Sequence, residues 1–537
     1  MHKIMNNKIK LLLVTSCLSL SMSSCIDLET APYDRKTDLT FWTEDSLSAY
    51  EALNTCYLNL ATMDEQMWSE CMTDNAYTKQ PSAYTQSIGN GTYSTADSYI
   101  LSVWDTKYAG IRQCNEVLNN IDKVSRLSES LKNRYIGEAK FIRAYHYYEL
   151  YTKFGDVPYF TNVITVAESK ELARTPKSEI VTNILADLDE IINNNYLPNS
   201  YGSNDKGRAA KWAAMALEAK IYLFEGNWQK VKELTSEIMN KGSFSLYPSY
   251  SGLFEISSEG NSEVILDAQY RPVSREHNIM YSFLPPSMGG YSQLSPLQEL
   301  VDSYIMLNGK NIKDAQSGYD ENNPYRDRDP RLAATVMYTG NSYTLADGST
   351  KIINCAPGQG QDGYGVTSDC SATGYYVKKY WDKTYRQSLL SGLNPILIRY
   401  ADILLMNAEA NAELGQLDAS IWNATIRPIR ERAGFTQASA LDFPSTSKNQ
   451  LIQIVRNERR SELAMEGLRH KDIMRWKIAE QVLNGYCHGI KTGEAIGTDN
   501  GYVRVENRQF DAQKHYLWPI PQHERDLDAN LTQNSNW

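Results

Sequence analysis

Three carboxylates in residues 451–476 are the side chains whose spacing comes closest to a catalytic arrangement. Glu458, Glu462 and Glu466 recur every four residues, which on a helix places neighbouring members about 6 Å apart on one face. Two carboxylates that flank a sugar bond are what a glycoside hydrolase needs. The predicted helix also carries apolar residues and a basic residue on that face: Leu451, Ile452, Ile454, Val455, Arg459, Leu463 and Met465.

The apolar surroundings of these carboxylates favour a structural role. An unpaired ion in a protein core costs several kcal/mol, so carboxylates on a core-facing stripe need basic partners. Arg459, Arg469 and arginines in other predicted helices, such as Arg143 and Arg399, could supply them. We therefore interpret the stripe as a buried ion-pair network and assign no catalytic residue. An exported glycoside hydrolase remains the alternative.

Other motifs with known chemistry are missing or misleading. The sequence contains no nucleophile elbow, His-Glu-x-x-His motif or P-loop. Gly358, Gly360 and Gly363 match a dinucleotide-binding pattern, but no helix follows to receive a pyrophosphate. In YRDRDPRL, arginines surround Asp327 and Asp329, which favours a salt-bridged turn over a calcium site. We expect no cofactor and no metal.

Aromatic side chains in polar loops are the remaining candidates for binding. The chain holds 36 Tyr, 10 Trp and 11 Phe, and a rigid ring beside amides and acids can stack on a sugar while its neighbours bind the hydroxyls. For any single ring, packing within its own loop remains the alternative. The predicted ligand-binding residues are Trp68, Asp74, Asn75, Tyr77, Tyr84, Tyr281, Tyr291, Gln293, Tyr364, Trp381 and Tyr385.

The N-terminus has the pattern of an export signal. Three lysines precede an apolar run over residues 11–20 that is too short to span a bilayer, and small residues follow it up to Cys25. We predict a signal peptide over 1–24, lipid attachment at Cys25 and an extended tether over 25–42; a plain secretory signal is the alternative. The net charge of −10 argues against nucleic acid as a partner.

Cysteine spacing excludes some site types. The six remaining cysteines form no Cys-x-x-Cys pair, so a zinc ribbon or a thioredoxin-type site is not expected. An exported chain permits Cys355–Cys370 or Cys56–Cys71 disulfides, and free, partly buried thiols are equally compatible with the sequence.

Helical periodicity dominates most of the chain. Residues 104–154, 175–195, 206–242 and 398–435 show it, and two Ala-rich helices are each followed by a turn, at Gly226 and at Gly415. These repeats suggest tetratricopeptide-like helix pairs. We predict a mainly α fold with one domain over 43–537, in which the helical scaffold covers about 43–244 and 395–485. A loop-rich insertion over about 245–394 would carry the ligand-binding region.

Several passages, in this order, resemble the SusD/RagB family of nutrient-binding outer-membrane lipoproteins of Bacteroidetes. They are the lipobox ending at Cys25, DLETAP through TFW, GEAKFIRAYHYYELYTKFGDVPYF, GRAAKWAAMALEAKIYLFEGNW, YRDRDPRL, IRYADILLMNAEA, NERRSELAMEGLRHKDIMRW and YLWPIPQHERDLDANLTQNSNW. The resemblance implies a tetratricopeptide-like scaffold with an irregular ligand-binding region. It also implies a lipid-anchored position on the outer face of the outer membrane.

The resemblance further implies a partner and a task. The protein would bind a glycan without cleaving it and deliver it to a SusC-like TonB-dependent transporter. Ligand residues vary within such a family, so the predicted binding residues rest on the loop aromatics alone. A structural or adhesin-like surface protein remains a further alternative.

Overall fold

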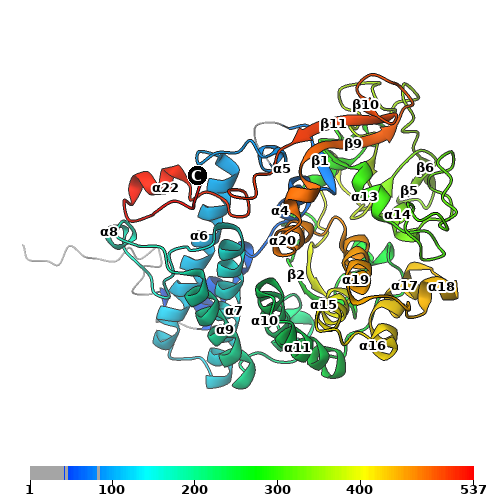
Figure 1. The fold of residues 1–537 in the computed structure, drawn as a ribbon. Helices are drawn as coiled ribbons and strands as arrows, with labels where there is room; N and C mark the ends of the chain where they lie inside the picture. Colours follow the sequence, from blue (N-terminus) through cyan, green and yellow to red (C-terminus); the bar gives the residue numbers. More distant parts are fainter. Residues whose placement is uncertain (1–40, 43–45, 81–84) are drawn as a thin grey trace, which may run out of the picture.

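The computed structural model describes residues 41–42, 46–80 and 85–537. This part of the chain is mainly α-helical, as the sequence predicts, and its sheets have only two or three strands (Figure 1). None of its helices is long and apolar enough to cross a membrane. The longer helices are α3 (Ser46–Leu58), α6 (Ser98–Asn120), α7 (Glu129–Phe154), α9 (Lys177–Asn193), α10 (Lys211–Glu225), α11 (Trp228–Lys241), α15 (Tyr400–Glu413) and α19 (Lys448–Leu463).

Antiparallel helix pairs form the scaffold. α6 packs on α7, α7 on α9, α10 on α11, and α11 on α15. The turn between α10 and α11 begins at Gly226, whose φ of 74° suits glycine because a Cβ would crowd the backbone there. Gly415 takes the same conformation after α15, with φ of 70°. The tetratricopeptide-like pairing predicted from these two glycines is therefore present.

Small side chains let the scaffold helices approach closely. The alanines of α10, including Ala213, Ala216 and Ala219, are fully buried. α7 is buried along most of its C-terminal half, because α3, α6, α9 and α10 all contact it. These helices share one apolar core. Trp42, at the end of the predicted tether, is also buried in that core.

The segment 245–394 is irregular and has its own core, in which short helices and strands pack under long loops. Two of its strands pair with distant segments: β2, within the strand-like stretch 262–270, with β8, and β3 with β1. Two strand pairs connect the two halves: β1 (Ala76–Thr78) with β3 (Leu294–Pro296), and β2 (Val264–Asp267) with β8 (Ile396–Arg399). β4 (Val336–Met337) and β7 (Tyr376–Val377) pair with each other inside the loop-rich segment.

The prediction of one continuous helix over 451–476 is wrong. α19 ends at Leu463, and α20 (Arg469–Arg475) begins after a turn. Met465 and Gly467 in this turn have φ of 63° and 74°, conformations that an α-helix cannot contain. Glu466 therefore reaches the core from the turn and not from the helical stripe.

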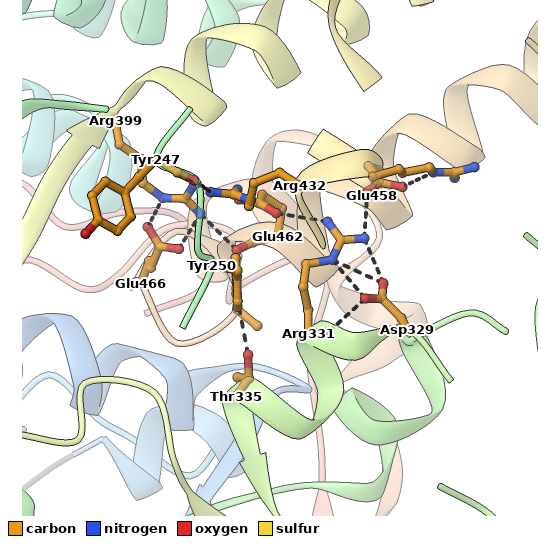
Figure 2. Close-up of polar contacts among 12 residues, drawn as sticks. Tyr247, Tyr250, Asp329, Arg331, Thr335, Arg399, Arg432, Glu458, Glu462 and Glu466 are labelled. Atoms are coloured by element: carbon orange, nitrogen blue, oxygen red, sulfur yellow. Dashed lines mark hydrogen bonds and ion pairs between the residues drawn. The ribbon is translucent and has the colours of Figure 1, made fainter. Parts of the chain in front are cut away.

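The predicted burial and pairing of the three carboxylates are confirmed, and Glu462 lies at the centre of the network (Figure 2). Of the four predicted arginine partners only Arg399 contacts them, because Arg143, Arg459 and Arg469 pair with aspartates instead. One Glu462 oxygen lies 2.7 Å from Arg399 Nη1 and also contacts Arg432, and the other lies 2.9 Å from Arg331 Nη1. Glu466 binds Arg399 at 2.6 Å. Because these arginines come from α14 (Pro330–Thr335), the end of β8, and α17 (Ile426–Ala433), the network joins the helical scaffold to the loop-rich segment.

The arginines keep these buried carboxylates ionised. Burial alone would raise the pKa of Glu462, but Arg432, Arg399 and Arg331 together lower it well below its ordinary value. Glu458 and Glu466 are shifted in the same direction. A carboxyl group that arginines keep ionised inside a core is suited to holding elements together, not to donating protons.

Two smaller features match or resolve the sequence interpretation. Asp329 caps α14 and pairs with Arg331 at 2.7 Å, which is the salt-bridged turn expected in YRDRDPRL. All six described cysteines are free and buried, so the disulfide alternatives are not realised.

A histidine in the C-terminal sheet pairs with two carboxylates, one of which lies on a helix of the loop-rich segment. The sheet consists of β9 (Gly485–Lys491), β10 (Thr498–Asp499) and β11 (Tyr502–Arg508), and β9 packs on α13 (Gln298–Ser303). His488 on β9 lies between Glu299 of α13, 2.8 Å from Nδ1, and Asp499 of β10, 3.0 Å from Nε2. Hydrogen bonding to Glu299, the largest influence, and to Asp499 raises the pKa of His488 to about 9.

We expect Glu462→Ala to destabilise the protein by about 3–5 kcal/mol, because it leaves buried arginines without a counter-charge. Urea unfolding followed by circular dichroism measures the change. The control is Glu431→Ala, which removes an exposed ion pair to Arg427 on α17 and should cost at most about 1 kcal/mol. Equal losses in both variants would contradict the structural role of Glu462.

His488 should stabilise the folded protein fully below pH 6.5, the ordinary pKa of histidine. This stabilisation should be lost as the pH rises through about 9, the raised pKa of His488 in the folded protein. The free energy of unfolding should therefore fall more steeply between pH 7 and pH 9.5 in the wild type than in His488→Gln. Urea titrations of both proteins at both pH values measure the two slopes. Subtracting the slope of the variant from that of the wild type cancels the titration of all other groups. Parallel slopes would show that the contacts of His488 with Glu299 and Asp499 contribute nothing to stability.

Candidate functional site

Three of the predicted binding residues are buried beneath the surface. Trp68 is 3% exposed and belongs to the core of the loop-rich half. Asp74 accepts a hydrogen bond from Arg469 Nε at 2.8 Å and lies 3.0 Å from Arg460 Nη2. Burial alone would raise the pKa of Asp74, yet these two arginines lower it well below its ordinary value.

Asn75 is held in the same way. Its side-chain amide donates to Glu70 at 2.8 Å, and its carbonyl oxygen accepts from Arg460 Nε at 2.9 Å. Asp74 and Asn75 directly precede β1, so their bonds to Arg460 and Arg469 hold the start of this strand on α19 and α20. In this structure Asp74 and Asn75 are buried structural residues that position β1, and they lie beneath the surface that a ligand could reach.

Two exposed tyrosines lie in contact and form an aromatic surface. Tyr281 in α12 (Ile279–Phe283) is 36% exposed and Tyr291 is 38% exposed. Their ring centroids lie 4.3 Å apart with 32° between the planes, so the rings support each other. The backbone N–H of Tyr291 donates to the carbonyl of Tyr281 at 2.9 Å, which fixes the turn between them. We call these two residues the tyrosine pair.

Polar predicted residues lie beside the tyrosine pair. Gln293 accepts a hydrogen bond from Ser282 Oγ at 3.4 Å, and its backbone carbonyl accepts from the N–H of Lys79 at 3.1 Å. Tyr77 lies on β1, which pairs with β3, and its hydroxyl accepts from Gln86 at 3.3 Å. β1 and β3 thus bring Tyr77 and Gln293, which lie more than 200 residues apart, to one place.

A long loop over residues 355–370 borders this surface. The backbone N–H of Ser287, in the turn between the paired tyrosines, donates to Asp362 at 2.8 Å. Tyr364 in the loop is half-buried, and its backbone bonds to Cys355 and Gly358. Sequence reasoning missed Lys79, whose ammonium group donates to the carbonyls of Ser368 and Cys370 at 2.5 and 3.1 Å. A lysine in a polar loop gives no sequence signal that its side chain will bind the backbone of another loop.

Trp381 and Tyr385 form a second aromatic group. Tyr385 is 40% exposed, whereas Trp381 is 9% exposed and donates its indole N–H to the carbonyl of Thr344 at 2.8 Å. Their ring centroids lie 5.5 Å apart, so Trp381 supports Tyr385 from below. The group lies near the tyrosine pair, because α12 contacts the short helix η7 (Gln387–Leu389) that follows Tyr385.

Two predicted residues, Tyr84 and the lipidation residue Cys25, lie outside the described residues. Among the residues that the structure describes, no three His, Cys, Asp or Glu side chains are grouped so that they could hold a metal ion. What the described surface offers is exposed aromatic rings beside amide and backbone groups, an arrangement suited to stacking on a flat ligand and bonding to its hydroxyls.

Two family models match the chain. The model described as the SusD family matches residues 252–537, more than half of the chain. A second model, described as "Starch-binding associating with outer membrane", matches residues 31–223. Together they cover both the helical scaffold and the loop-rich half.

Individual proteins agree with the models. A SusD-like protein of Formosa agariphila is 26% identical over 96% of this chain and 97% of its own length. The starch-binding protein SusD of Bacteroides thetaiotaomicron is 22% identical over 78% of this chain and 75% of its own. The crystal structure of a SusD-like carbohydrate binding protein of Bacteroides fragilis superposes with a TM-score of 0.82 at 29% identity, covering 92% of this chain and all of that one. The chain therefore belongs to the SusD family.

Proposed function

We propose that this protein is a cell-surface glycan-binding lipoprotein that captures an oligosaccharide or polysaccharide and passes it to a SusC-like TonB-dependent transporter. Family membership supports this role, as do relatives whose names describe starch or carbohydrate binding. A structure described as a laminarin-binding SusD-like protein shares the fold, with a TM-score of 0.69 at 23% identity over 92% of this chain and all of that one. The signal-peptide pattern and Cys25 support anchoring to the outer membrane, facing outward.

The observation that carries the proposal is the exposed tyrosine pair. Water solvates the ring faces of exposed tyrosines poorly. Two such rings with 4.3 Å between their centroids present a preformed apolar surface to a ligand. A sugar ring could lie on Tyr281 or Tyr291 while Gln293 and the loop backbone bond to its hydroxyls. Tyr77, Tyr364 and Tyr385 would extend the contact along a chain of sugars.

The proposed mechanism is binding without cleavage. The carboxylates that could have imitated a hydrolase pair are enclosed in the ion-pair network, where arginines hold them ionised. Binding is tested by affinity electrophoresis in gels that contain starch, laminarin or other soluble polysaccharides. Retardation without release of reducing ends supports the proposal, and release of reducing ends in the same samples would contradict it.

Replacing both members of the tyrosine pair, as Tyr281→Ala with Tyr291→Ala, should weaken glycan binding ten- to a hundredfold, about 1.4–2.8 kcal/mol. The melting temperature should change little, because both rings are exposed. Calorimetry with the polysaccharide that retards the wild type most measures the loss. The matched control replaces both tyrosines with Phe, which keeps the ring faces and should retain most of the affinity. Unchanged affinity in the Ala variant would exclude the tyrosine pair from the site.

Trp381→Ala and Tyr385→Ala should separate support from contact. Trp381 is largely buried, so its removal leaves a cavity and should destabilise the protein by about 3–5 kcal/mol. Tyr385→Ala should weaken glycan binding and leave the melting temperature nearly unchanged. Differential scanning calorimetry and glycan titration measure both effects. A stable Trp381→Ala protein that had lost only binding would instead make Trp381 a direct contact.

A further inference from the structure

A pocket opens on the helical scaffold between α6, the segment 158–172 and α22 (Gln522–Leu527). Its volume is about 330 Å³, which is enough for a small ligand. None of its lining residues belongs to the loop-rich segment 245–394. Figure 1 shows α6 and α22 on one side of the molecule and α14 of the loop-rich segment on the other. We call it the α6–α22 pocket.

Aromatic rings line the pocket. Trp104 and Tyr108 lie one turn apart on the same face of α6, with 4.9 Å between their ring centroids. The Phe160 ring stacks on Tyr108 at 5.9 Å with 12° between the planes, and the Tyr108 hydroxyl donates to the carbonyl of Pro158 at 2.8 Å. Val166, which begins α8 (Val166–Ser169), also lines the pocket and is 73% exposed. Apolar surface that stays open to solvent beside fixed rings is typical of a binding site.

Three carboxylates share this pocket with the rings. Asp105 lies on α6, Glu524 on α22, and Asp528 directly follows α22. The backbone N–H of Asp528 donates to the carbonyl of Glu524 at 2.9 Å, so these two residues lie one helical turn apart. None of the three carboxylates forms an ion pair with a basic side chain in the part of the chain that the structure describes. Asp528 is 3% exposed, and its Oδ2 has no hydrogen-bond partner there. A buried carboxylate oxygen without a donor is costly and indicates that a donor comes from elsewhere.

The basic groups near the pocket do not balance these carboxylates. Arg112 also lines the pocket, but it pairs with Glu116 at 3.8 Å on the exposed face of α6. His523 faces Asp105 and Glu524, and a histidine side chain carries little charge at neutral pH. Three carboxylates and one guanidinium group therefore leave negative charge in excess.

The pKa values of two carboxylates are consistent with this excess. Burial, the largest influence, raises the pKa of Asp105, and burial together with the charge of Asp105 raises the pKa of Glu524. A hydrogen bond with Trp104 only partly opposes the shift of Glu524. Arg174, which lies near Tyr108, donates to backbone carbonyls and forms no ion pair with these carboxylates. A cation in the pocket would stabilise the ionised form of both groups.

We propose that the α6–α22 pocket binds a small organic cation, a protonated primary amine attached to a flat apolar body. The ammonium group would lie among the three carboxylates and donate to Asp528 Oδ2. The apolar body would pack on the rings of Tyr108 and Phe160, whose faces also attract positive charge. An anion would be repelled, and a neutral ligand would leave the negative charge uncompensated. This inference does not depend on the proposed glycan function.

The probe is 2-phenylethylammonium, and its neutral and anionic counterparts of similar shape are 2-phenylethanol and phenylacetate. Isothermal titration calorimetry of the mature protein at pH 7 should show that the cation binds at least about tenfold more tightly than the alcohol. Phenylacetate should show no binding. Equal affinities for the three compounds, or no binding of the cation at millimolar concentration, would overturn the proposal.

Substitutions that remove one charge test the role of the carboxylates. Asp528→Asn and Asp105→Asn should each weaken binding of the cation about tenfold. Asp105 is exposed on α6, so its replacement stays informative if the variant at the buried Asp528 proves unstable. The matched control is Asp526→Asn on α22, which removes an exposed carboxylate that accepts from Gln522 at 2.7 Å and should leave the affinity unchanged. The same affinity in all four proteins would contradict the proposal.

Crystals of the protein soaked with 2-(4-bromophenyl)ethylammonium locate the ligand directly, because bromine scatters anomalously. The bromine peak is expected beside Tyr108 and Phe160, and it should be absent in Asp105→Asn crystals soaked at the same concentration. Bromine only at the tyrosine pair or elsewhere on the surface, as an adventitious additive, would overturn the proposal.

Discussion

The contact between Glu462 and the guanidinium groups of Arg331, Arg399 and Arg432 is the interaction on which the rest of the structure depends (Figure 2). Each arginine comes from a different element, and all three elements lie outside the helix that carries Glu462. A buried ion pair is not a strong source of net stability, because desolvation offsets the attraction. It is, however, intolerant of misplacement, since any partner that moves leaves an uncompensated charge. The network therefore sets how the loop-rich half sits on the scaffold.

That constraint extends to the candidate binding surface. Arg460 and Arg469, close to Glu462 in sequence, hold Asp74 and Asn75, and these residues start β1. β1 pairs with β3, which places Tyr77 and Gln293 beside the tyrosine pair. An otherwise irregular region of the chain can thus present exposed rings in a defined geometry, because its base is fixed by charged contacts to regular helices. Loops anchored in this way are suited to binding without large rearrangement.

The sequence predicted the helical scaffold better than it predicted the candidate binding surface. Helix pairing at Gly226 and Gly415 followed from local periodicity, and pairing of the buried carboxylates followed from the cost of unpaired charge, so both were predictable. The same reasoning extended one helix over 451–476, where positive φ at Met465 and Gly467 breaks it, because periodicity does not register a turn between two helices with similar patterns. Among the loop aromatics, composition treated Trp68 and Tyr281 alike, yet one is buried and the other exposed.

The sequence by itself determined the helical class, the repeated helix pairs, the acidic surface and the need for buried ion pairs, since each depends on local pattern or on a general energetic cost. Only the tertiary structure decided which carboxylate meets which arginine and which aromatic rings reach solvent. These features join residues that lie up to about 400 positions apart, such as Glu70 and Gly467. Burial and pairing are properties of the packed chain, and no local stretch of sequence contains them.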